Sequence, residues 1–191
     1  MSPILDSIGS VKGYGWGALS AVGDFQSIAT TTVGAGGVSS VTFGSIPSTF
    51  THLQIRALVK NTVNYAWGAN VQLNGATDYS RYHRLGEDTS SGSGVIADNG
   101  TALGQTFFTY GATAATNIFG VAIVDILDYT STNKYKTLRS FSGWDNNGGG
   151  VLFETSSLYA TTSAVSSLVI TPSSGNIAQH SSFALYGIKG V

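Results

Sequence analysis

The sequence predicts an all-β protein, a jelly-roll-like antiparallel β-sandwich with an extended N-terminal segment. Short stretches rich in Val, Ile, Thr and aromatic residues recur between Gly, Asn and Ser turns, and helical periodicity is nearly absent. Long hairpins recur as well, which favours a jelly roll over other sandwiches, with a closed barrel as the alternative. The 191 residues suffice for one well-buried domain, predicted at 25–191.

The first predicted strands, residues 25–33 and 38–43, flank the glycine run 34–37. Because glycine adopts positive φ freely, this run predicts a tight hairpin. Residues 52–60 alternate between apolar and polar side chains, as in a half-buried strand, and only Leu58 interrupts the polar side. Further strands are predicted at 70–73, 81–85, 105–110, 151–154, 157–161, 165–171 and 182–188.

Residues 118–127 and 134–143 form the longest predicted hairpin, and its first arm is apolar on both faces. A strand in an antiparallel sandwich normally shows one polar face to water, so a doubly apolar arm needs a further surface packed against it. Residues 182–188 have apolar side chains on both faces too. The outward residues of these two strands form the predicted subunit interface: Phe119, Val121, Ile123, Tyr186 and Ile188.

Residues 1–24 are punctuated by glycine and too irregular for a helix. We expect this segment to be pinned against its own domain or a partner, and folding back over the apolar faces is the monomeric alternative to a subunit interface. Its predicted contact residues are Ile4, Leu5, Ile8, Tyr14 and Trp16. The polar stretch 86–101 is predicted to be a loop at an exposed end of the sandwich, where loops read ligands.

The composition excludes several classes of partner. Charged residues make up 10% of the chain, against about a quarter in average proteins. Ser and Thr take the solvent positions instead, as is common in proteins built into large assemblies. The net charge is −1 and the basic residues are scattered, which argues against nucleic acid as a partner. We expect no membrane partner, because the chain lacks a signal peptide and a long apolar run.

Motifs for catalysis, metal binding or cofactor binding are missing. The histidines His52, His83 and His180 stand far apart, and there is no cysteine to act as a metal ligand. No nucleophile elbow or P-loop occurs. The stretch 145–148 has oxygen ligands but lacks the spacing of a calcium loop, which favours a tight turn. The sequence thus predicts no catalytic residues, no metal and no cofactor.

Asp125 and Asp128 are the one candidate carboxylate pair. Residues three apart on a strand point to opposite faces, which argues against their use in glycoside hydrolysis. Asp125 falls on an apolar face, so we expect a buried ion pair with a residue such as Arg139 across the hairpin and a turn position for Asp128.

Several aromatic residues are candidates for stacking on sugars, although packing in the core or between subunits is the default for them. They are Trp16, Trp67, Trp144, Tyr65, Tyr79 and Tyr82. Tyr65 and Trp67 lie in the stretch NYAWGAN, and its glycine and asparagine residues favour exposure. These two are the predicted glycan contacts.

Residues 117–150, NIFGVAIVDILDYTSTNKYKTLRSFSGWDNNGGG, and the C-terminal SSFALYGIKG resemble virion structural proteins of tailed bacteriophages, particularly marine and cyanobacterial phages. Residues 50–62 and 71–85 are similar to the preceding strands of the same module. The resemblance implies a β-rich, trimeric component of a phage particle, either a tail fibre or a capsid decoration protein. The stretch DSIGSVKGYGWG, residues 6–17, is similar to N-terminal segments that attach phage fibre proteins to the particle.

The expected function is therefore that of a non-enzymatic virion protein, made in the host cytoplasm, self-associating as a homotrimer and attached to other virion proteins through residues 1–24. The alternative is a carbohydrate-binding module at a fibre tip that mediates host attachment through Tyr65, Trp67 and residues 86–101. An enzyme that trims host polysaccharide is the third possibility, and it lacks an identifiable acid pair.

Overall fold

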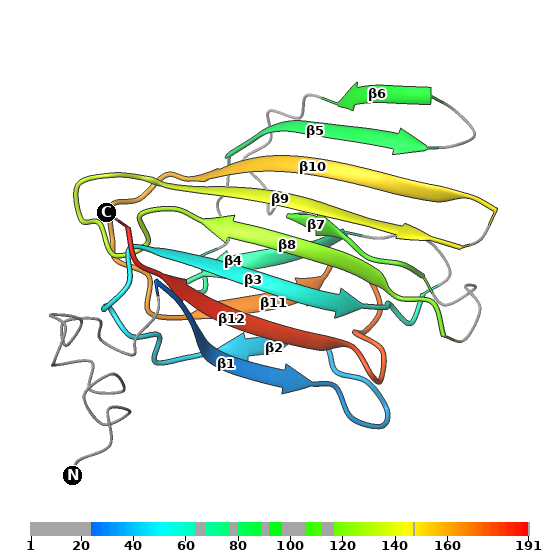
Figure 1. The fold of residues 1–191 in the computed structure, drawn as a ribbon, viewed down its shortest axis with the longest axis horizontal. Helices are drawn as coiled ribbons and strands as arrows, with labels where there is room; N and C mark the ends of the chain where they lie inside the picture. The colour runs from blue at the N-terminus through cyan, green and yellow to red at the C-terminus, as the bar shows by residue number, and fades with distance from the viewer. Residues whose placement is uncertain are drawn as a thin grey trace, which may run out of the picture.

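The computed structural model describes residues 24–63, 68–76, 80–88, 92–96, 106–111, 117–146 and 148–190. This part of the chain forms twelve strands and no helix, so none of it could cross a membrane as a helix (Figure 1). The strands are β1 (Phe25–Thr32), β2 (Val41–Phe43), β3 (His52–Val59), β4 (Gly68–Leu73), β5 (Ser80–Asp88), β6 (Gly92–Ile96), β7 (Phe107–Phe108), β8 (Gly120–Ile126), β9 (Lys136–Asp145), β10 (Gly150–Tyr159), β11 (Leu168–Pro172) and β12 (Ser182–Ile188).

The strands form two antiparallel sheets that pack together, which confirms the predicted sandwich. The larger sheet has the order β1-β12-β3-β8-β9-β10-β5-β6, and the smaller one β2-β11-β4-β7. Figure 1 looks onto the larger sheet, with β6 at the top and β1 at the bottom. Without the hairpins β5–β6 and β9–β10, four strands in the order β1-β12-β3-β8 oppose β2-β11-β4-β7. This is the double-sheet arrangement of a jelly roll, and the two hairpins widen one of its sheets.

The core lies between the sheets and follows the period of two that strands impose. Inward side chains of the larger sheet include Leu53 and Ile55 of β3 and Val124 of β8, and each is inaccessible to solvent. Leu168 and Leu73, from the smaller sheet, close the core from the other side. One face of the larger sheet packs on this core. The residues that alternate with the inward ones along each strand therefore point to the outer face of that sheet.

The predicted hairpin at the glycine run 34–37 is wrong. Gly36 and Gly37 do have positive φ, at 86° and 71°. However, the chain passes there from one sheet to the other, since β1 pairs with β12 whereas β2 pairs with β11. After the turn, Val38 forms a bridge with Ile177. A glycine run allows the same tight turn in a hairpin and in a crossover between sheets. Here β1 pairs with β12 instead of β2, so the turn is a crossover.

Two further expectations about the elements need correction. Residues 151–154 and 157–161 are predicted as separate strands, but a single strand, β10, runs without interruption from Gly150 to Tyr159. The stretch 86–101 was expected as a loop, yet β5 continues to Asp88 and pairs with β6. In both cases a pairing with a neighbouring strand extends regular structure through residues of weak strand propensity.

Candidate assembly face

The outer face of the larger sheet carries a group of large apolar side chains. Leu58, Val121, Phe141 and Leu152 have exposed fractions of 53%, 46%, 49% and 43%, and Ile123 is half-buried. They come from the four adjacent strands β3, β8, β9 and β10. We call these five residues the outer patch. Exposed apolar residues scattered singly are normal, but a contiguous group indicates an interaction surface.

The register of the sheet makes the outer patch contiguous. Leu58 lies directly opposite Val121, and Val121 and Leu152 both lie opposite Gly143. Gly143 has no side chain, and the Leu152 side chain covers it: Leu152 Cδ1 is 3.4 Å from where a Cβ would stand. The remaining two members of the outer patch lie opposite each other one row further along. The five side chains therefore form one surface that spans four strands.

A shallow groove of about 510 Å³ borders the outer patch on its β12 side. Its lining includes Thr30 and Thr32 of β1, together with Ser182 and Ala184 of β12. The small side chains of β12 lie between the threonines on one side and Leu58 on the other. The apolar surface is thus continued by a depression with hydroxyl groups along its edge.

Charged residues lie beside the outer patch on the same face. The Gln54 side-chain amide donates to Asp125 Oδ1 at 2.7 Å, and Arg56 Nε donates to Gln54 Oε1 at 2.9 Å. Arg139 Nε donates to Glu154 Oε1 at 2.7 Å. The expected buried ion pair between Asp125 and Arg139 is wrong, although the two residues are opposite each other in the register. The even-numbered residues of β8 fill the core, so Asp125 stays on the outer face, where it is only half-buried.

The structure places the predicted interface residues in three settings. Val121 and Ile123 belong to the outer patch. Tyr186 and Ile188 lie on the outer face of β12, separated from β8 by β3. Phe119 precedes β8 and is half-buried. Sequence reasoning did not include Leu58, Phe141 and Leu152. Leu58 carried a signal, because it interrupts the polar side of its strand, whereas the other two belong to the patch only through cross-strand pairing.

An aromatic cluster lies on the outer face of β1 and β12, next to β3. Phe25 of β1 and Tyr186 of β12 stack with ring centroids 4.6 Å apart. The Arg56 guanidinium carbon lies over both rings, 5.1 Å and 5.6 Å from their centroids. These contacts hold the Arg56 charge on the outer face beside the outer patch.

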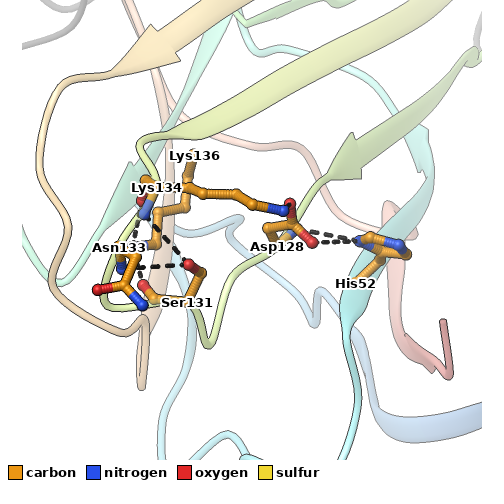
Figure 2. Close-up of polar contacts among 6 residues, drawn as sticks. All are labelled: His52, Asp128, Ser131, Asn133, Lys134 and Lys136. Carbon is orange, nitrogen blue, oxygen red and sulfur yellow. Dashed lines mark hydrogen bonds and ion pairs between the residues drawn. The ribbon is translucent and has the colours of Figure 1, made fainter.

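A second polar cluster occupies the turn after β8 (Figure 2). Asp128 has a φ of 51°, its backbone N–H donates to His52 Nδ1 at 3.0 Å, and Lys134 Nζ lies 2.9 Å from its carboxylate. The hydrogen bond from Lys134 holds the pKa of Asp128 below its usual value. The expected turn position of Asp128 is confirmed. Since His52 Nδ1 accepts from the backbone, this histidine orders the turn.

Lys136 is the most unusual residue of this cluster. It is fully buried, and its ammonium group donates to the backbone carbonyl oxygens of Ser131, Lys134 and Thr161 at 2.5, 3.1 and 3.5 Å. Burial lowers the pKa of Lys136. The side chain joins the turn before β9 to the segment after β10, which is a structural role.

Several predicted residues lie outside the part of the chain that the structure describes. These are the N-terminal residues Ile4, Leu5, Ile8, Tyr14 and Trp16 and the glycan candidates Tyr65 and Trp67. Their roles stay predictions. Within the described ranges, no three His, Asp or Glu side chains gather closely enough to hold a metal ion.

Comparison with known protein families and with curated proteins finds no match to this chain. The phage context expected from the sequence therefore stays a prediction.

Proposed function

We propose that this protein is a non-enzymatic structural component of a tailed-phage virion, which self-associates through its outer face and is attached to the particle by residues 1–24. The observation that carries the proposal is the outer patch. An isolated sandwich gains nothing from large apolar side chains exposed on four adjacent strands. A subunit of an assembly buries them against a neighbour.

The energy available from this burial is substantial. Full burial of a Val, Leu, Ile or Phe side chain contributes about 1.5–3 kcal/mol relative to full exposure. Four members of the outer patch are about half exposed, so each can still contribute roughly half of that amount in an interface.

The resemblance supplies the phage context of the proposal. It implies a virion location, either as a tail fibre or as a capsid decoration protein, and three copies per assembly. Antibody labelling tests this location. The antibody is raised against the purified chain and applied to intact particles of a phage that encodes it. Signal over the head or at the tail supports the proposal and chooses between the two positions. Particles that carry no signal, while infected cells do, would contradict it.

Val121→Asp is expected to weaken self-association of the purified chain at least about 100-fold, because a carboxylate would have to be buried within the outer patch. The unfolding temperature should change little, since Val121 is 46% exposed in the single subunit. Sedimentation velocity over a range of concentrations measures the association. Thr42→Asp, at an exposed position of β2, is the matched control and should associate like the wild type. Equal association of both variants would rule out the outer patch as the contact.

The second candidate function is a carbohydrate-binding module for host attachment, and the aromatic cluster favours it. The Phe25 ring is 43% exposed, and the side chains of Arg56, Gln54 and Asp125 follow beside it. Sugars bind to aromatic faces with polar side chains nearby. If this function holds, Phe25→Ala should reduce binding to host-surface glycan at least about 10-fold, whereas Thr42→Ala should not. A glycan array without signal for the wild-type chain would remove this candidate.

A further inference from the structure

We propose that the outer patch of one copy packs against the outer patch of a second copy about a twofold axis that runs parallel to the strands, between β8 and β9. This inference rests on the self-association in the proposed function and specifies its partner and geometry. It is a pairing of two copies, and so differs from the three copies that the resemblance implies.

The pairing register arranges the outward residues of β3, β8, β9 and β10 in three rows across the sheet. The first row is Leu58, Val121, Gly143 and Leu152, the second is Arg56, Ile123, Phe141 and Glu154, and the third is Gln54, Asp125, Arg139 and Ser156. The first row is apolar throughout. The second and third rows each contain one positive and one negative residue.

A twofold axis parallel to the strands keeps each row opposite the same row of the partner and reverses the order of the strands. With the axis between β8 and β9, β3 faces β10 of the second copy, and β8 faces its β9. Leu58 then faces Leu152, and Ile123 faces Phe141. Every large apolar residue in the second row thus meets another one, and the first row packs apolar surface on apolar surface. Such self-complementarity is what an isologous interface requires.

The charges are complementary under the same operation. Arg56 of each copy faces Glu154 of the other, and Asp125 faces Arg139. Arg56 and Asp125 have only neutral side chains as partners within the described chain, namely Gln54 and the two stacked rings. The second copy would therefore supply the opposite charge that both lack. Pairing of this kind fixes the register of an interface and suppresses alternatives.

Three other twofold arrangements of the same face bring like charges together. An axis along β8 places Asp125 on Asp125, and an axis along β9 places Arg139 on Arg139. An axis across the strands, through the second row, places Arg56 on Arg56 and turns Leu58 towards Gln54. The placement between β8 and β9 avoids all of these contacts. It is also compatible with the aligned packing of twisted sheets, about 10 Å apart and rotated by about 30°.

The experiment is a charge swap between two variants. Arg56→Glu alone and Glu154→Arg alone each create two like-charge contacts in the pair, so each should self-associate at least about 10-fold more weakly than the wild type. In an equimolar mixture, a mixed pair has opposite charges in both contacts. The mixture should therefore recover association to within about threefold of the wild type. Lys189→Glu, an exposed charge reversal beyond the end of β12, is the control and should associate normally.

A second measurement does not depend on charge. The chain has no cysteine, so Leu58→Cys and Leu152→Cys each introduce a single thiol. A short bismaleimide should cross-link the mixture of the two variants and leave each variant alone unlinked, because position 58 faces position 152 and not itself. Circular dichroism checks that every variant is folded.

The outcomes separate the two proposals. If the wild-type chain associates but the mixtures show neither recovery nor cross-links, the twofold pairing is wrong and the proposed function stands. If the measured molar mass of the wild-type assembly equals that of three copies, the twofold pairing is wrong and the trimer is supported. A wild-type chain that stays monomeric at high concentration would overturn the pairing and self-association together. Particle labelling tests the virion location independently of both.

Discussion

Replacing Lys136 by methionine is expected to lower the free energy of unfolding by about 3 kcal/mol or more. Lys136 begins β9 and is fully buried, and its ammonium group donates to three backbone carbonyl oxygens. Methionine has a similar length and fits an apolar site, but it has no donor. The three carbonyls would lose this partner at once, and a hydrogen bond to a charged group contributes about 1.5–3 kcal/mol.

Urea unfolding followed by tryptophan fluorescence measures this difference. Lys134→Met is the matched control, because Lys134 lies two residues away with a side chain that is 68% exposed. Its ion pair with Asp128 is a surface pair, so its loss should cost less than about 1 kcal/mol. If the two variants were equally stable, the buried lysine would not hold the turn between β8 and β9, and the role assigned to Lys136 would be wrong.

The sequence predicts the core of this fold well, because the core follows from alternation within single strands. In residues 52–60 the alternation identifies Leu53 and Ile55 as inward, and both are buried completely. The doubly apolar character of residues 118–127 is also a local property, and the structure shows why it matters: Val124 is buried, while Val121 stays exposed on the outer face. Alternation within one strand predicts which side chains are buried, because the backbone fixes the side-chain period at two residues.

Features that depend on pairing between distant strands were not predictable. Phe141 looks like an ordinary outward residue of its own strand, and it becomes part of a surface only because β9 pairs with β8. Arg139 lies opposite Asp125 in the register, as its position in the hairpin predicts, but Gln54 on the other neighbouring strand donates to the Asp125 carboxylate instead. The glycine run 34–37 shows the same limit, since a turn does not specify which sheet receives the next strand. Pairing is a property of the whole fold.

The glycine at position 187 shows how tightly the inner face of β12 is packed, and Gly187→Val is expected to destabilise the protein by about 3 kcal/mol. A Cβ at this position would stand 2.3 Å from ring atoms of Phe50, a buried member of the core. Introducing a branched side chain would therefore push the Phe50 ring out of its site. Overpacking costs about 1–3 kcal/mol by itself, and loss of the contacts of a buried aromatic ring adds to this.

A double-mutant cycle identifies the cause of this destabilisation. Phe50→Ala removes the ring that the new side chain would meet, so Gly187→Val should cost at least about 1 kcal/mol less in that background than in the wild type. Gly44→Val is the matched control, because a Cβ at Gly44 meets no atom within 4 Å, and it should change stability by less than about 0.5 kcal/mol. Urea unfolding of the four members of the cycle gives the coupling energy. Additive effects would show that Phe50 is not the obstacle and that backbone distortion of β12 dominates, since the residue pairs with both β1 and β3.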